Sequence, residues 1–216
     1  GVGIVLLKPL HKAIEDKDSI YAVIKGTSSN QDGHSNGITT PDLSSQKHLI
    51  LNTLNNSNIH PETISYIEAH GTGTNIGDPI ELRALTEAYS SYTKKKQFCA
   101  IGSLKGNIGH PVAAAGIASL IKVVLSMKNS IIPGSVRFNE PNEYIDFENS
   151  PFYVNDQSKK WENTKGVPKR SGISSFGISG TNVHVIVEDF ENQKINNDSN
   201  QELLHFFTLS AKNKNS

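Results

Sequence analysis

The chain has 216 residues, with 21 basic and 21 acidic side chains and a formal net charge of zero. This length suits one large domain, and the charge balance argues against a nucleic acid as the main partner. No apolar run looks long enough to span a bilayer, and the single cysteine, Cys99, permits no disulfide within the chain. We therefore expect a cytoplasmic protein that binds neither nucleic acid nor membrane.

The first residues have the pattern of a buried strand. Residues 1–7 are apolar, and Pro9 ends the run. Residues 19–24 predict a second strand, and residues 26–37 form a polar, glycine-bearing stretch that reads as a long loop, either a plain connection or the lining of a site. Because the chain opens inside a strand pattern and closes inside another at residues 203–210, we expect a piece of a longer polypeptide.

The middle of the chain alternates helix and strand patterns. We predict helices over residues 41–55 and 78–92, and strands over residues 63–69 and 98–102. Asp78 and Glu81 stand where an N-cap and a capping box want acidic side chains, with Pro79 at the first helical position. Residues 112–127 are apolar nearly all round, which predicts a helix buried inside the domain.

The last part of the chain has shorter patterns. Strands are predicted over residues 132–138, 152–154, 170–176 and 183–187. Residues 175–182 form a loop between the last two, and residues 191–201 are rich in Asn, Asp and Gln, which is typical of a linker.

Two histidines mark the chemistry. His70 follows the strand of residues 63–69 and precedes a loop of two glycines and two threonines, and His110 stands directly before Pro111, where a helix is expected to begin. A helix N-terminus and burial both disfavour imidazolium, and a neutral imidazole can donate an N–H to a negative oxygen as it forms. The pair predicts carbonyl chemistry, either acyl transfer or decarboxylative carbon–carbon bond formation.

Other interpretations of these residues are weaker. Cys99 lies in a short apolar strand and suits an inert core residue better than a nucleophile. A metal site of His70, His110 and Glu68 lacks any short ligand spacing. His184 lies within a predicted strand, so we expect it to be structural.

Residues 68–74, 103–110 and 174–184 resemble the three motifs of the C-terminal half of a β-ketoacyl synthase, above all of the ketosynthase domains of modular polyketide synthases. The resemblance covers residues 1–189, including the loop of residues 26–41, and residues 206–211 resemble the linker that follows such domains. It implies a thiolase-like layered αβαβα fold, to which residues 1–190 contribute mainly the C-terminal half. Residues 191–201 would be a polar linker, and residues 202–216 the start of the following linker region.

The resemblance implies a decarboxylative Claisen condensation. An acyl thioester would react with a malonyl-type extender carried on the phosphopantetheine of an acyl carrier protein, with no cofactor bound directly. His70 and His110 would stabilise the enolate and the oxyanion, and Lys105 would hold the His110 loop in place. The family's nucleophilic cysteine lies upstream, so the fragment alone should be inactive. The implied partners are the upstream half of the same domain and a second copy in a homodimer.

The resemblance also implies substrate contacts and one departure. Thr72 and Thr74 would hydrogen-bond the pantetheine arm, Phe176 and Gly177 would gate the acyl pocket, and Asn107 is a further substrate-binding candidate; no metal is implied. Many family members carry a glutamate two residues after the second histidine, where this chain has Val112. A carboxylate partner for Lys105 must then come from elsewhere or is lost.

Two alternatives follow from these features. A non-elongating ketosynthase, which binds or transfers an acyl group without condensation, is suggested by Val112. A degradative thiolase fits less well, because that family usually uses a second cysteine and this chain has only Cys99.

Overall fold

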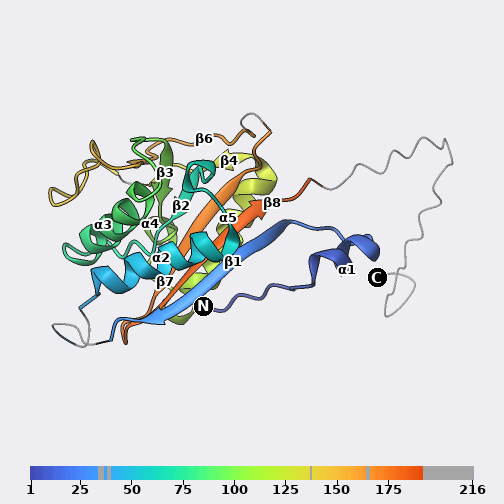
Figure 1. Cartoon of the computed structure of the whole chain (residues 1–216), viewed down its shortest axis with the longest axis horizontal. Helices are drawn as coiled ribbons and strands as arrows, with labels where there is room; N and C mark the ends of the chain where they lie inside the picture. The colour runs from blue at the N-terminus through green and yellow to red at the C-terminus, as the bar shows by residue number, and fades with distance from the viewer. Residues whose placement is uncertain (34–36, 38–39, 137, 164–165, 192–216) are drawn as a thin grey trace, which may run out of the picture.

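The computed structural model describes residues 1–33, 37, 40–136, 138–163 and 166–191 (Figure 1). Its centre is a six-stranded sheet in the order β1-β8-β7-β2-β3-β5. Strands β7, β2, β3 and β5 are parallel to one another, whereas β8 runs antiparallel to both β7 and β1. The strands are β1 (Ala22–Gln31), β2 (Tyr66–Glu68), β3 (Cys99–Gly102), β5 (Phe152–Val154), β7 (Arg170–Phe176) and β8 (Thr181–Asp189), with a separate antiparallel pair of β4 (Ile131–Ile132) and β6 (Lys159–Lys160).

Helices cover both faces of the sheet (Figure 1). α2 (Leu43–Ser57) and α3 (Gly77–Ser90) lie on one face, and α5 (Ala115–Asn129) packs on β7 and β8 at the other. Side chains alternate along each strand, so Ile67 enters the core beneath α2 and α3, while Tyr66 enters the core beneath α5. The shorter helices are α1 (Leu10–Glu15), α4 (Lys105–Ile108) and the 3₁₀ turns η1 (Pro61–Thr63) and η2 (Val112–Ala114).

Most of the expected elements are present with small shifts in their ends. The helix expected over residues 41–55 is α2, and Asp42 caps it by accepting a hydrogen bond from the Ser45 N–H at 2.7 Å. The strands expected at residues 152–154 and 170–176 have those bounds. The α/β class predicted from the alternation of patterns is therefore confirmed.

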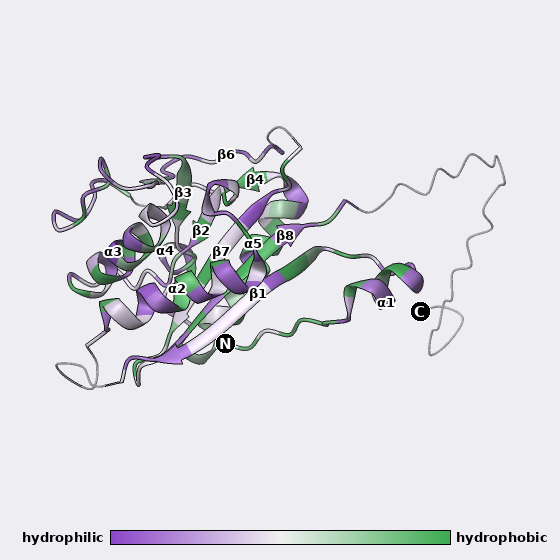
Figure 2. Cartoon of the chain, in the orientation of Figure 1, coloured by the Kyte–Doolittle hydropathy of each residue, from purple (hydrophilic) through white to green (hydrophobic). Residues whose placement is uncertain are grey.

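The strand expected over residues 1–7 is wrong. This segment is extended but pairs with no described strand, and Ile4 and Leu6 are 88% and 95% exposed. Figure 2 shows its apolar residues outside the layers, although a Cβ at Gly3 would come within 2.8 Å of Ile117 on α5. A strand pattern needs a neighbouring strand to supply its hydrogen bonds, and none of the described strands lies there.

The polar loop expected over residues 26–37 is also partly wrong. Residues 26–31 continue β1, which pairs with β8 as far as Gln31 opposite Thr181. The register shifts between Ile24 and Gly26, where any Cβ would lie 2.7 Å from the Ser57 side chain. Pairing with β8 overrides the low strand propensity of these polar residues. Residues 34–36, 38 and 39 of the expected loop lie outside the described residues.

The apolar helix begins later and is less buried than expected. η2 precedes it, the α-helix starts at Ala115, and its buried residues are confined to one side, while Leu125 is 47% exposed. Among the described residues, Val112–Asn129 has the length and apolarity of a membrane span, which the expectation from sequence excluded too strictly. Core helices of soluble proteins also meet this criterion, and Lys122 in its middle pairs with the buried Glu68.

Two further expectations concern the last third. Within the described part of the strand expected over residues 132–138, only Ile132 is in a strand, as the second residue of β4, which pairs with β6. The expected linker at residues 191–201 and the region at residues 202–216 lie outside the described residues except for Glu191.

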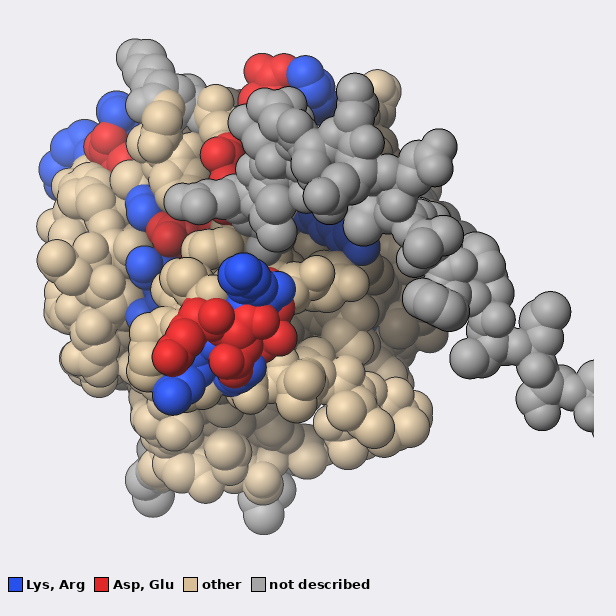
Figure 3. All heavy atoms as spheres, turned by 90° about the vertical axis from the view of Figure 1, so that its right-hand side faces the viewer, with Lys and Arg blue, Asp and Glu red and all other residues tan. Residues whose placement is uncertain are grey.

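On the side of α1, Figure 3 shows acidic and basic side chains next to one another, as in the pair of Lys8 and Asp18, whose Nζ and Oδ2 atoms are 2.6 Å apart.

Candidate active site

Parallel pairing brings the two histidine loops together. β2 and β3 are neighbours with Glu68 opposite Gly102, so the loops that leave their carboxyl ends start side by side. The imidazole rings of His70 and His110 lie with centroids 5.7 Å apart at 81°. β7 lies on the other side of β2, and the ring of its last residue, Phe176, is centred 5.4 Å from that of His70. The three motifs therefore meet at one sheet edge.

Backbone N–H groups orient both imidazoles. The Phe176 N–H donates to Nδ1 of His70 at 3.3 Å, and the Val112 N–H donates to Nδ1 of His110 at 3.0 Å. A neutral imidazole whose Nδ1 accepts a hydrogen bond carries its proton on Nε2. Both rings can therefore donate an Nε2–H, which is the form that a developing oxyanion needs.

Burial keeps His70 neutral. It lowers the pKa of His70 to about 4, with the nearby Lys105 and His110 acting in the same direction. At neutral pH the ring is therefore an uncharged donor. His110 is exposed, and it lies between the end of α4 and the start of η2. Pro111 is the N-cap of η2, which runs into α5, so the helical segment after His110 begins one residue later than the sequence suggested, with a 3₁₀ turn instead of an α-helical turn.

Lys105 holds the His70 side of the site rather than pairing with an acid at position 112. Its Nζ donates to the backbone carbonyl of His70. Burial lowers the pKa of Lys105, whereas the carboxylates of Glu81, Glu68 and Asp78 act to raise it. Val112 points elsewhere and is 76% exposed at a φ of +52°. The carboxylates near Lys105 thus come from β2 and α3.

The capping box expected at Asp78 and Glu81 is wrong. α3 starts at Gly77, and the position before it has no side-chain cap. The Glu81 carboxylate turns toward the histidine loop, where it accepts the N–H groups of His70 at 2.7 Å and Gly71 at 2.9 Å, while Asp78 accepts the N–H of Gly73 at 3.1 Å. Burial raises the pKa of Glu81 to about 7. The sequence pattern therefore singled out both acidic residues, but it assigned their hydrogen bonds to the first turn of α3, whereas they accept N–H groups of the loop that follows β2.

The expected substrate-binding residues lie at or just after the carboxyl ends of β2, β3 and β7. The Thr72 and Thr74 hydroxyls lie 3.3 Å apart on the glycine–threonine loop, and Asn107 is exposed on α4. The Gly177 N–H, just after Phe176, donates to the Thr181 carbonyl at 2.7 Å and closes the turn between β7 and β8. Their contacts with a substrate stay predictions.

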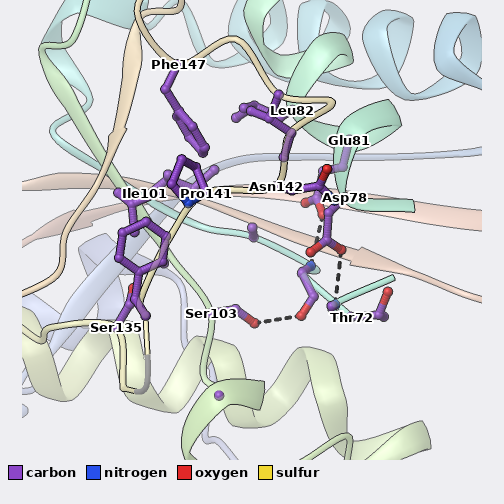
Figure 4. Close-up of a pocket in the computed structure, with 18 of the residues that line it drawn as sticks. Thr72, Asp78, Glu81, Leu82, Ile101, Ser103, Ser135, Pro141, Asn142 and Phe147 are labelled. Carbon is purple, nitrogen blue, oxygen red and sulfur yellow. Dashed lines mark hydrogen bonds between the residues drawn. The ribbon is translucent and has the colours of Figure 1, made fainter. Parts of the chain in front are cut away.

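A cavity of about 970 Å³ opens against the same loop (Figure 4). Thr72, Asp78, Glu81 and Lys105 line it, and residues of the segment 135–147 form the facing wall, whereas neither histidine contributes. Figure 4 shows Pro141, Asn142 and Phe147 above the Thr72 side. The sequence did not predict this wall, because residues 135–147 have an irregular composition with no periodic pattern.

Cys99 and a metal site can be assessed directly. Cys99 is fully buried in β3, and burial raises the pKa of its thiol, which removes the thiolate that a nucleophile needs. Among the described residues no group of three or more His, Cys, Asp or Glu side chains is placed to hold a metal ion.

His184 lies in the core of β8, where its Nδ1 is 3.0 Å from the Ser174 hydroxyl. Burial lowers its pKa to about 4. Between about pH 6.5 and pH 4, the unfolded chain binds a proton on the His184 ring and the folded protein does not. Titration of His184 therefore leaves the free energy of unfolding unchanged above about pH 6.5 and lowers it as the pH falls below that value. We expect His184→Gln to flatten the fall in the free energy of unfolding over this range by on the order of 3 kcal/mol, measured by chemical denaturation at several pH values. An unchanged slope would contradict it.

The comparisons with known proteins agree with this geometry. Residues 21–139 match the family model described as beta-ketoacyl synthase, C-terminal domain, and residues 141–216 match the ketoacyl-synthetase C-terminal extension. The chain therefore belongs to the β-ketoacyl synthase family, and its fold is the C-terminal part of the thiolase-like architecture.

The relatives are polyketide synthases. The chain is 49% identical over 213 residues to polyketide synthase PksL of Bacillus subtilis (strain 168), which covers 98% of this chain and 5% of that protein. A ketosynthase from module 6 of the bacillaene synthase of Bacillus subtilis 168 superposes with a TM-score of 0.84 at 50% identity, over 85% of this chain and 33% of that one. A Streptomyces albus JA3453 oxazolomycin ketosynthase domain superposes with a TM-score of 0.81 at 34% identity, over 85% of this chain and 32% of that one. The chain thus spans about a third of these solved ketosynthases.

Proposed function

We propose that this chain supplies the imidazole pair of a polyketide synthase ketosynthase that catalyses decarboxylative Claisen condensation. The observation that carries the proposal is the pairing of His70 and His110, whose rings lie 5.7 Å apart with both Nδ1 atoms occupied by backbone N–H groups. Two Nε2–H donors on rings this close together suit the oxygen of a thioester as it takes up negative charge.

In the proposed reaction, a cysteine outside this chain carries the acyl group as a thioester. The buried Cys99 cannot take this role, and the chain spans only about a third of the solved ketosynthases. The malonyl-type thioester loses CO₂, and the electron pair of the broken bond forms an enolate, to whose oxygen the imidazoles donate. The enolate carbon attacks the acyl carbonyl, and the tetrahedral intermediate collapses with release of the cysteine thiolate.

The partners follow from this reaction. An acyl carrier protein would present the extender on its phosphopantetheine arm, and we expect Thr72 and Thr74, on the loop that follows His70, to hydrogen-bond the amides of that arm. Phe176, whose backbone also orients His70, would control access to the acyl pocket. The upstream half would complete the domain, which we expect to be a homodimer located in the cytoplasm, and the fragment alone should be inactive.

The test is product formation by a complete ketosynthase domain that includes this chain. The domain is loaded with an acyl thioester and mixed with malonyl-charged carrier protein, and mass spectrometry follows the carrier-bound chain. We expect a β-ketoacyl product longer by one extender unit. If the acyl group moves to the carrier without lengthening, the domain is the non-elongating type that Val112 suggests, and the condensation proposal is wrong.

A further inference from the structure

Glu68 is a buried carboxylate at the end of the strand that leads to His70, and it contacts residues on both sides of His110 in the sequence. It is the last residue of β2, two positions before His70, and it is fully buried. Oε1 accepts the backbone N–H of Leu104 at 2.6 Å and lies 3.4 Å from the Ser119 hydroxyl. Oε2 accepts the Tyr66 hydroxyl at 2.8 Å and pairs with Nζ of Lys122 at 2.6 Å. Four donors from three parts of the chain thus satisfy one side chain.

These donors bracket the second histidine. Leu104 lies six residues before His110, at the start of α4, whereas Ser119 and Lys122 lie after it, on α5. The segment that carries His110 is therefore attached at both ends to one carboxylate. The strand that carries His70 supplies that carboxylate, so the two rings share a common anchor.

The buried ion pair of Glu68 and Lys122 is better explained by the orientation that it gives to β2 and α5 than by a contribution to the stability of the fold. The side chains of Glu68 and Lys122 are 0% and 13% exposed, and a buried ion pair is often no more stabilising than apolar side chains of the same size. Such a pair does fix which groups lie opposite one another, because removing one partner leaves a buried charge without compensation. Lys122 also donates to the Tyr66 hydroxyl at 2.8 Å, which leaves little freedom in the cluster.

We propose that Glu68 is a positioning residue of the condensation reaction, which sets the distance between the His70 and His110 rings by tying residues 104–122 to the end of β2. This inference rests on the proposed function for its kinetic consequence. Its structural consequence, the separation of the rings, does not depend on that function.

The test uses a complete ketosynthase domain that includes this chain, with Glu68→Gln combined with Lys122→Gln so that no buried charge is left alone. We expect the ring centroids in its crystal structure to move from 5.7 Å by more than about 0.5 Å. The kcat of condensation should fall about 100-fold, while KM for malonyl-charged carrier protein changes little, because the substrate still binds.

A matched control separates positioning from general loss of stability. Asp189→Asn combined with Lys169→Gln removes another largely buried pair without leaving a charge alone; the Lys169 and Asp189 side chains are 12% and 10% exposed, and Nζ lies 3.2 Å from Oδ2. This pair stands at the end of β8 away from Phe176, so we expect an unchanged ring separation and kcat. Equal losses of kcat in the control and the double variant of Glu68 and Lys122 would overturn the inference.

A milder variant keeps the inference testable if the double variant does not fold. Tyr66→Phe removes one donor to Glu68 and one acceptor for Lys122 while keeping the buried ring, and we expect kcat to fall about three- to tenfold with an unchanged KM. Unchanged kcat and ring separation in the variant that folds would overturn the proposal. If the wild-type domain forms no lengthened product, the proposed function fails, and the ring separation alone then decides whether Glu68 positions the histidines.

Discussion

His110→Ala in a complete ketosynthase domain that includes this chain is expected to slow condensation by about 10²- to 10³-fold. Removal of one oriented donor to a developing oxyanion has an effect of this size in other enzymes. Here the loss is of the Nε2–H that the Val112 N–H holds in place through Nδ1. The fold should be unaffected, because the His110 side chain is exposed and packs in no core cluster.

The measurement is the rate of lengthened product after the nucleophilic cysteine has been acylated, so that acylation and condensation are read separately. We expect acylation to change far less than condensation, since the imidazole pair is proposed to act on the extender. His48→Ala is the matched control, because His48 is exposed on α2 and its Nδ1 lies 3.3 Å from the Ser44 hydroxyl of the same helix. A variant without His110 that condenses at the rate of this control would show that the assigned role is wrong.

Gly71→Ala is expected to separate the two histidine loops. Gly71 has a φ of +42°, and a Cβ there would lie 2.8 Å from the Ser103 Cβ, which belongs to the loop that leads to Lys105. The Ser103 hydroxyl donates to the Gly71 carbonyl at 3.2 Å, so the methyl group falls where the loops are joined. We expect condensation to fall about 100-fold, because a displacement of about 1 Å is enough for such a loss.

Gly73→Ala is the control for backbone strain. Gly73 also has a positive φ, of +74°, but a Cβ there would meet nothing within 4 Å. Its substitution should lower the free energy of unfolding by about 1 kcal/mol through strain alone, measured by denaturant titration, with a much smaller effect on condensation. If the two alanine variants condense equally slowly, the contact with Ser103 is not what positions His70.

The amino-acid sequence by itself indicated the class of chemistry and where its residues stand. One histidine follows a strand directly and precedes Gly71-Thr72-Gly73-Thr74, and a second stands before Pro111, in the segment that follows the next strand. Parallel strands place the segments that leave their carboxyl ends at one edge of a sheet. The positions of α2, β7 and Cys99 also followed from local patterns, because capping residues and β-branched runs report on their own neighbours.

Tertiary structure alone decided the assignments that depend on distant partners. Glu81 looks like a capping residue in sequence, but its carboxylate accepts the N–H groups of His70 and Gly71, eleven and ten residues before it. Residues 26–31 look like a loop and become a strand because β8 offers them a partner about 150 residues away. Glu68 carried no signal of its own, since its four donors come together only when β2, α4 and α5 have packed. Local propensity is a short-range property, whereas the pairing of a buried charge or a strand edge depends on which segments the fold brings alongside it.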